Sequence, residues 1–541
     1  MMMIKYLIAG IALLLWACEA PEDIASSQFD QSNEGLVVAA HPLAAQAGRL
    51  MLEKGGNAAD AAVAAGFALA VVEPSMSGIG GRLMALLRTS EGDIHGIDAT
   101  TQAPMAYDTA TAADVPFGYP TVGIPGVVAG LIKILEEHGT MSLETVMAPA
   151  IQFAEAGFNL LPGEALRHSM QLDEIKQFEG TSRYFLKGDS TYSAGELLVQ
   201  QDLANTLKAI AVGGRDAFYK GAIAEKMISD LQKNGSVMTL EDLAAYQAED
   251  RMVLKSTYRG YEVNALWMPS FGAITLEIMN ILEQLPMGEL SEADWATACY
   301  QAIALAYEDR DKQTSDSMAQ VLIAKDYAAS LFPQVNLQSN TNRQLGFLGA
   351  SPEQWQQLDG HTTHLSASDK NGMTVSLTQS LGPNMGSRVA SPELGFLYAV
   401  TLGRYLGVFD PGQRAASHIS PVIVTRDGQP FLTLGAAGGS LIIPAVVTVM
   451  SRVIDQQLPL DQALAAPRVF FQADSMLVEN HEGINWNPAS LEEIQSEGFF
   501  LKKINQPARF GRVHAVQFDP KTKTWIGAAD PDWEGAVGKP Q

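Results

Sequence analysis

Residues 361–380 read HTTHLSASDKNGMTVSLTQS, and this stretch decides the expected fold. The runs 363–368 and 373–380 are rich in β-forming residues, and an Asn-Gly pair between them is a strong hairpin signal. If the chain cut itself between His361 and Thr362, this threonine would carry a hydroxyl nucleophile and a basic α-amino group on one residue. An ordinary strand opening has the same composition, so the stretch alone leaves both interpretations open.

The segments around the hairpin indicate layers of helices and strands. Further β-rich runs are Pro421–Thr425, Pro430–Leu434, Val513–Phe518 and Trp525–Ala528. A helix is expected from Ile442 to about Gln456, after a glycine-dense turn. Upstream, Pro42–Leu52 and Ala58–Val72 favour two helices separated by a glycine pair, and Asn57 or Asp60 could cap the second. Hairpins beside helices predict an α+β fold with a largely antiparallel sheet.

Composition narrows the class of protein. The chain has 541 residues, of which 47% are hydrophobic and 18% charged, as in globular proteins. Its net charge of −24 argues against a nucleic-acid partner, because phosphates would be repelled. No Gly-x-Ser-x-Gly elbow or His-Glu-x-x-His helix occurs, and the nine histidines are scattered. We therefore expect no metal and no cofactor, and we expect Cys299 to be a buried apolar residue.

The N-terminus predicts export. Lys5 precedes an apolar run, Tyr6–Ala17, which is too short to span a bilayer as a mature helix. A small residue before Cys18 resembles a bacterial lipobox, so we expect residues 1–18 to be a lipoprotein signal and Cys18 to carry the lipid. Residues 19–34 contain five acids and no base, as an acidic tether would. The alternative is a plain secretion signal and a soluble periplasmic protein.

Several segments, taken in order, resemble the gamma-glutamyltransferase family of N-terminal nucleophile hydrolases. They are Val38–Ala44, Gly55–Ala62, Glu73–Gly81, Gly123–Gly126, Thr362–His364, Ser417–Pro421, Gly438-Gly439 and Ala529–Pro531. Each motif is weak alone, but their order and spacing through most of the chain are specific. The resemblance implies a four-layer αββα sandwich. It also implies a precursor that cuts itself into a large subunit, 35–361, and a small catalytic subunit, 362–541.

The resemblance assigns catalytic roles residue by residue. Thr362 supplies the hydroxyl nucleophile and the amine base. Ser380 matches a family threonine that hydrogen-bonds the nucleophile, and Gly438 and Gly439 match backbone donors of an oxyanion hole. Thr363 steadies the backbone of the nucleophile. The polar segment 336–357 before the cut is expected to be an exposed loop, which could move aside once freed.

The implied substrate-binding set is Thr100, Thr363, Gly382, Thr401, Arg404, Ser417 and His418. Four of its members depart from the family pattern, and one of them is His418, which follows Ser417 where the family has a pair of serines. Thr100 replaces an arginine that grips the substrate α-carboxylate, Gly382 replaces an asparagine, and Arg404 aligns with an acidic residue that holds the ammonium group. We therefore hypothesise that the preferred acyl group is not a simple γ-glutamyl unit, and that Arg404, Arg82 or Arg388 holds a carboxylate lacking a neighbouring amine.

The expected function is that of an exported, self-processing amidohydrolase or acyltransferase. Its acyl-enzyme forms on Thr362, and its partners are a small-molecule amide or peptide and its own two subunits. It touches a bacterial membrane only through a lipid anchor, on the periplasmic side. Two alternatives remain at this point: an acylase of the same fold acting on a non-γ-glutamyl amide, and a catalytically lapsed, lipid-anchored binding protein.

Overall fold

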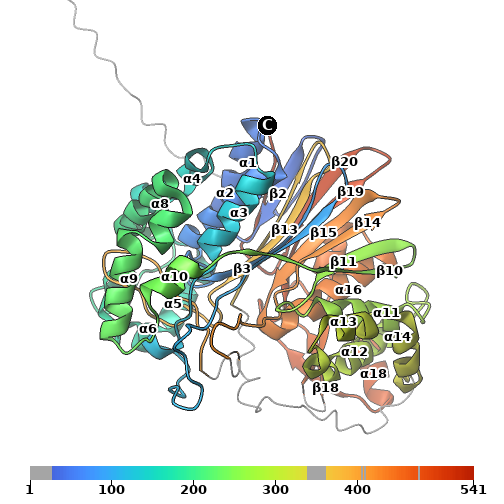
Figure 1. The fold of residues 1–541 in the computed structure, drawn as a ribbon. Helices are drawn as coiled ribbons and strands as arrows, with labels where there is room; N and C mark the ends of the chain where they lie inside the picture. Colours follow the sequence, from blue (N-terminus) through green and yellow to red (C-terminus); the bar gives the residue numbers. More distant parts are fainter. Residues whose placement is uncertain (1–26, 338–360, 404–405, 407–409, 473–474) are drawn as a thin grey trace, which may run out of the picture.

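Two antiparallel sheets face each other in the computed structural model, and helices cover the outer face of each (Figure 1). The structure describes residues 27–337, 361–403, 406, 410–472 and 475–541. Cys18, Arg404 and most of the expected polar loop lie outside these ranges. No helix in the described part of the chain is both long and apolar enough to cross a bilayer.

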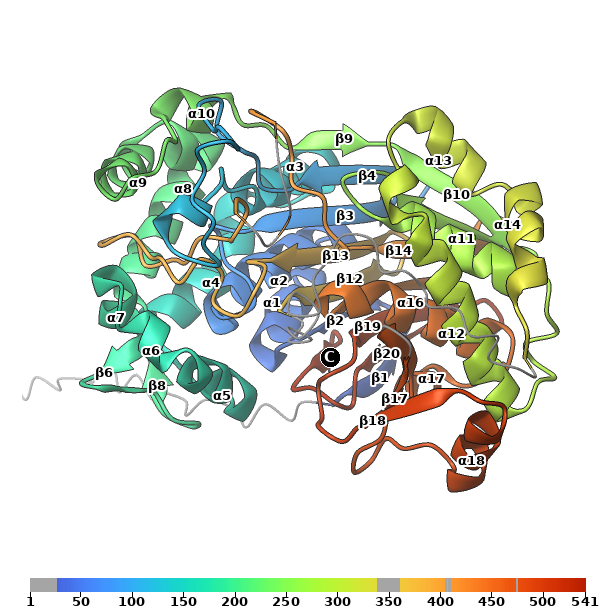
Figure 2. The same cartoon turned by 90° about the horizontal axis from the view of Figure 1, so that it is seen from below.

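The first sheet contains the hairpin that opened the sequence analysis. Its strands, in spatial order, are β21 (Ala536–Gly538), β2 (Gly35–Ala39), β12 (Thr363–Asp369), β13 (Thr374–Ser380), β3 (Arg82–Arg88), β4 (Ile94–Ala99) and β9 (Glu249–Arg251). Figure 2 shows β2, β12, β13, β3 and β4 side by side. The hairpin is confirmed, because Thr363 pairs with Gln379 and the turn glycine, Gly372, has φ 90°.

The second sheet has the order β1 (Phe29–Ser32), β20 (Thr524–Ala529), β19 (Arg512–Asp519), β15 (Gln429–Ala437), β14 (Val422–Arg426), β11 (Tyr261–Leu266) and β10 (Val253–Tyr258). Every neighbouring pair in both sheets is antiparallel. Each sheet therefore combines strands from before and after the bond between His361 and Thr362.

Helices complete the four layers. Those on the first sheet are α1 (Pro42–Glu53), α2 (Ala58–Val72), α3 (Val127–His138), α4 (Leu143–Ala156) and α8 (Gln201–Tyr219), which share one hydrophobic core with it. Those on the second sheet are α11 (Gly272–Leu282), α12 (Glu292–Glu308), α16 (Ile442–Ile454) and α17 (Leu460–Ala465), which share another. The expected αββα sandwich is thus confirmed.

The remaining elements lie around these layers. The helices are α5 (Pro162–Met170), α6 (Leu172–Ile175), α7 (Glu179–Phe185), α9 (Ala222–Lys233), α10 (Leu240–Ala245), α13 (Asp316–Leu322), α14 (Lys325–Leu331) and α18 (Pro488–Ser496). The short strands are β5 (Phe158–Asn159), β6 (Leu186–Lys187), β7 (Ser190–Thr191), β8 (Leu197–Leu198), β16 (Val469–Gln472), β17 (Ser475–Glu479) and β18 (Phe500–Ile504).

Helix α2 shows how local sequence determines this architecture. All of its residues are buried, which its run of alanines permits through close packing. Its N-terminus is held by a reciprocal capping box, in which Asn57 accepts from the amide of Asp60 and Asp60 accepts from the amide of Asn57. Both expected capping residues therefore take part.

Strand alternation directs the polar face of the hairpin toward the second sheet. Leu365 and Ala367 point into the helix-facing core, whereas the Ser366 hydroxyl donates to the His514 carbonyl on β19. On β13, the Ser376 hydroxyl likewise donates to the Leu434 carbonyl on β15. By the same alternation, Thr362 and Ser380 belong to the face between the two sheets.

Candidate active site

The hairpin register brings Thr362 and Ser380 together. Because Thr363 pairs with Gln379, Thr362 lies opposite Ser380 at one end of the first sheet. Their hydroxyl oxygens are 3.0 Å apart, and the residues are 4% and 3% exposed. Two residues predicted to act together are thus in direct contact in a nearly closed site.

The peptide bond expected to break, between His361 and Thr362, lies at this contact. The His361 carbonyl oxygen accepts from Thr362 Oγ1 at 2.8 Å and from Ser380 Oγ at 2.9 Å. Ser380 Oγ itself accepts the amide N–H of Gly382 at 2.9 Å. Gly382 has φ 94°, a conformation that glycine adopts without strain, so its backbone is shaped to hold Ser380. Both hydroxyls polarise the carbonyl that Thr362 would attack.

The predicted oxyanion glycines lie at the same end of the sandwich. His364 on β12 packs against Gly435 on β15, where an added Cβ would lie 2.4 Å from the imidazole Cε1. Leu434, one residue before Gly435, contacts Ser376, which lies farther from Thr362 along the hairpin. Strand β15 therefore runs toward Thr362 as it continues beyond Gly435. Gly438 and Gly439 follow, with φ 149° and 58°, in the turn that leads into α16. Positive φ at both positions turns the backbone sharply there.

Behind the nucleophile, Glu73 connects two chain segments. The Thr363 hydroxyl donates to Glu73 Oε2 at 2.6 Å, and the Trp533 indole N–H donates to Glu73 Oε1 at 3.3 Å. Burial raises the pKa of Glu73, and the charge of Arg167 opposes that rise. No role for Glu73 or Trp533 could be predicted from the sequence. Glu73 did lie in a family-like segment, which was the available signal.

Two arginines enclose the Trp533 ring. The guanidinium carbons of Arg512 and Arg167 are 3.9 Å and 4.4 Å from its ring centre. Burial, and then the charges of Arg512, Arg167 and Arg388, hold the pKa of His361 well below its usual value. Burial and the neighbouring Arg167 lower the pKa of Arg512 to about 10. Three arginines therefore act on the His361 imidazole, and the ion pairs of Arg167 with Glu164 and Glu73 offset part of their charge.

Thr100 and Arg82, two of the residues considered for substrate binding, make contacts within the protein. The Thr100 hydroxyl donates to Asp98 Oδ1 at 2.7 Å and is fully buried. The Arg82 guanidinium, also buried, donates to the Val400 carbonyl. Thr401 is fully buried as well, and its amide donates to the Thr121 carbonyl at 2.8 Å.

Ser417 and His418 lie just before β14 and are partly exposed. The Ser417 amide donates to the Pro269 carbonyl at 2.8 Å. The His418 ring stacks on Tyr307, with centroids 6.0 Å apart, and tilts against Phe271 at 5.0 Å. Burial, followed by the charge of Arg310, keeps the pKa of His418 well below its usual value. His418 therefore presents a neutral ring.

An αββα sandwich with a threonine at the start of a central strand defines the class of N-terminal nucleophile hydrolases. Within that class, the gamma-glutamyltranspeptidase family model matches residues 44–539, and the chain belongs to this family. The family consists of enzymes, hydrolases and transferases, that act on amide bonds; the expected fold, family and enzyme class are thus confirmed.

Both hydrolases and acylases are among the relatives. The chain is 33% identical to a glutathione hydrolase proenzyme of Pseudomonas sp. (strain A14), over 90% of this chain and 89% of the relative. It is 30% identical to an acylase ACY 1 proenzyme of Pseudomonas sp. (strain SE83), over 92% of each chain. The solved cephalosporin acylase from Bacillus halodurans superposes with a TM-score of 0.85 at 26% identity, covering 98% of this chain and 100% of that one.

Proposed function

We propose that the chain cuts itself between His361 and Thr362, and that Thr362 then works as the N-terminal nucleophile of an amide hydrolase or acyltransferase. The supporting observation is the contact of Thr362 Oγ1 with both Ser380 Oγ and the His361 carbonyl oxygen, at 3.0 Å and 2.8 Å. In the cut, the hydroxyl attacks the His361 carbonyl carbon. The peptide C–N bond breaks as an ester forms on Thr362, and water then hydrolyses the ester to release the His361 carboxylate.

Substrate turnover reuses the same oxygen. The freed Thr362 α-amine accepts the proton of its own hydroxyl, which attacks the substrate carbonyl. Gly438 and Gly439 contribute the backbone donors to the developing oxyanion. The leaving amine takes the proton back, and water or an acceptor amine then cleaves the acyl ester. Hydrolysis and acyl transfer thus differ only in what attacks the second time.

The acyl group that this site prefers carries a carboxylate and no neighbouring ammonium. The first acyl group on Thr362 is that of His361 itself, so the groups facing the His361 side chain mark the space for a substrate acyl chain. Arg388, Arg512 and Arg167 supply positive charge there. Arg388 is one of the arginines considered from sequence. Asp98, beside Thr100, is already engaged by Arg414 at 3.4 Å. An anionic acyl chain suits a space on which three arginines act.

Two measurements test this proposal. Wild type should separate on a denaturing gel into two bands in place of a single 58.0 kDa chain, while Thr362→Ala stays whole and Thr362→Ser still processes. A single wild-type band would instead favour the lapsed binding protein. The processed enzyme should then cleave glutaryl-p-nitroanilide faster than γ-glutamyl-p-nitroanilide. The opposite preference would exclude the anionic-acyl assignment and leave the cleavage mechanism standing.

Export and lipidation form a separate part of the proposal, supported by the apolar run that ends at Cys18. Wild type expressed in a bacterial host should incorporate labelled palmitate and fractionate with membranes, whereas Cys18→Ser should do neither. Release of unlabelled wild-type protein into the periplasmic fraction would favour the plain secretion signal.

A further inference from the structure

Three residues from two distant segments converge outside the nucleophile site. Glu479 ends β17, His481 follows two residues later, and Asp532 lies in the loop between β20 and β21. One ligand atom from each lies within 4.8 Å of the others. The side chains are 1%, 5% and 6% exposed, respectively, so the group is almost closed to solvent.

The spacing does not suit hydrogen bonds. His481 Nε2 is 3.6 Å from Glu479 Oε1 and 3.5 Å from Asp532 Oδ2. A charge-assisted hydrogen bond from an imidazolium to a carboxylate would measure about 2.7–2.9 Å. Ligands held tetrahedrally about 2.1 Å from a Zn²⁺ ion are separated from one another by about 3.4 Å. Both distances are close to this ligand–ligand spacing, and without a metal they are those of ion pairs between the imidazole and the two carboxylates.

The orientation of the His481 ring also suits a metal ligand. Its Nδ1 is 3.0 Å from the Glu482 carbonyl oxygen, which can only accept, so Nδ1 carries a proton. Nε2 points at the two carboxylates, whose polar contact and charge raise the pKa of His481 to about 9, so a bound cation would take the place of the Nε2 proton. Neither Nε2 nor Glu479 Oε1 has a hydrogen-bond partner among the described residues. A histidine that binds metal through one nitrogen typically donates its other N–H to a carbonyl in this way.

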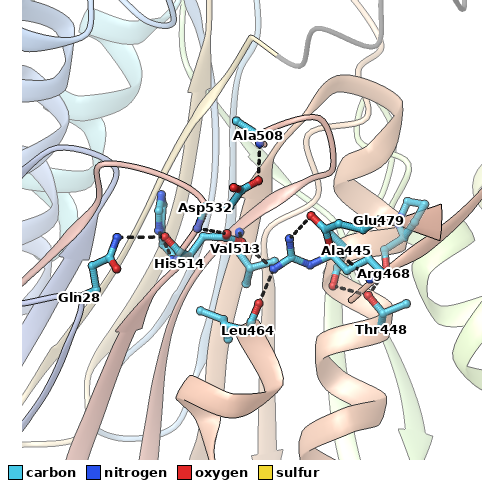
Figure 3. Close-up of polar contacts among 12 residues, drawn as sticks. Gln28, Ala445, Thr448, Leu464, Arg468, Glu479, Ala508, Val513, His514 and Asp532 are labelled. Carbon is cyan, nitrogen blue, oxygen red and sulfur yellow. Dashed lines mark hydrogen bonds and ion pairs between the residues drawn. The ribbon is translucent and has the colours of Figure 1, made fainter. Parts of the chain in front are cut away.

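The surrounding contacts orient the carboxylates (Figure 3). Glu479 Oε2 accepts the Arg468 amide N–H at 3.2 Å, and Asp532 accepts the Ala508 amide N–H. Arg468 makes its short ion pair with Asp530, at 2.7 Å, and stays 3.6 Å from Glu479. Asp530 is therefore the close partner of Arg468. Glu479 and Asp532 share the single charge of His481, which leaves negative charge for a divalent cation to neutralise.

We propose that Glu479, His481 and Asp532 bind one divalent transition-metal ion of the Zn²⁺ type, with solvent completing a four-coordinate shell. One imidazole and two carboxylates suit this class of metal. Asp532 directly precedes Trp533, whose indole N–H holds Glu73 behind the nucleophile. The bound ion therefore fixes the loop that supports Thr363, and its role is structural.

Zinc binding to the purified full chain tests the proposal. After chelator treatment, gel filtration with added Zn²⁺ should leave about one equivalent per chain by elemental analysis, and the melting temperature should rise. His481→Gln and Asp532→Asn should each weaken binding at least 100-fold. Glu482→Gln, which removes an exposed carboxylate beside the cluster, should bind as wild type does.

Two results would overturn the site: no stoichiometric retention by wild type, or retention by His481→Gln equal to that of Glu482→Gln. If the two variants fail to fold, Co²⁺ added to the metal-free wild type provides the test. The site predicts the strong visible absorption of four-coordinate Co²⁺, and absence of this absorption would contradict it. Thr362→Ala should bind Zn²⁺ normally, so this outcome is independent of the proposed catalysis.

Discussion

Replacing Ser380 with alanine removes one hydroxyl that serves three neighbours, and we expect it to slow chain cleavage strongly. The hydroxyl contacts the nucleophile at 3.0 Å and the His361 carbonyl at 2.9 Å, and it accepts the Gly382 amide at 2.9 Å. Removing one hydrogen-bond donor from a developing oxyanion typically costs about 2.7–4 kcal/mol, or roughly 10²–10³ in rate. Cleavage should slow by about that factor.

The same change has a separate cost in stability. It leaves the buried Gly382 N–H without its acceptor, which costs about 1–3 kcal/mol in the free energy of unfolding. Ser380→Thr is the matched control, because it keeps the hydroxyl and suits a strand. Urea unfolding of each uncut variant measures stability apart from cleavage.

The assay follows the disappearance of the 58.0 kDa chain with time on denaturing gels after purification at low temperature. Wild type and Ser380→Thr should convert at comparable rates, whereas Ser380→Ala should persist. If Ser380→Ala cleaved as fast as wild type while Thr362→Ala remained whole, the reasoning that places Ser380 on the scissile carbonyl would be wrong.

Two further predictions concern the packing around the site. Burial lowers the pKa of His41 from 6.5 to about 3. Below pH 6.5, His41 is therefore protonated in the unfolded chain but not in the folded chain. The free energy of unfolding should then fall by about 1.4 kcal/mol per pH unit. His41→Asn keeps the cap acceptor for α1 and should lessen this drop in denaturant titrations between about pH 7 and pH 5; equal slopes would contradict the assignment. Gly435→Ala should abolish soluble, processed enzyme, because its Cβ would lie 2.4 Å from the His364 ring. In Gly78→Ala the nearest atom to the new Cβ would be 3.6 Å away, an ordinary contact, so this variant should fold. Processing of Gly435→Ala at the wild-type rate would show that this contact is not constraining.

Local sequence was sufficient to predict the hairpin, whereas the contact of Ser380 with Thr362 was expected from the family resemblance. The hairpin turn over Asn-Gly fixes the register of the two strands, and this register places Ser380 opposite Thr362. The capping of α2 was likewise visible, since Asn57 and Asp60 lie within one turn of each other. The hairpin and the cap needed only neighbours along the chain.

The support behind the nucleophile could not be predicted in this way. Glu73, Arg167, Arg512 and Trp533 come from four separate segments, and only the packing of helices on sheets brings them together. Sequence shows that Arg82 is charged, but it does not show that its guanidinium is buried and turned to a backbone carbonyl. Burial and long-range pairing were the missing information.

The interleaving of the two sheets has a kinetic consequence. In the part of the chain that the structure describes, five strand pairs, among them β2 with β12 and β13 with β3, join residues before His361 to residues after Thr362. An uncut chain that unfolds can find these partners again within one molecule. Once the bond is broken, pairing of these strands requires two separate chains to associate, at a rate set by their concentration. Refolding of the cleaved protein would therefore be inefficient. The active form would persist because it unfolds slowly.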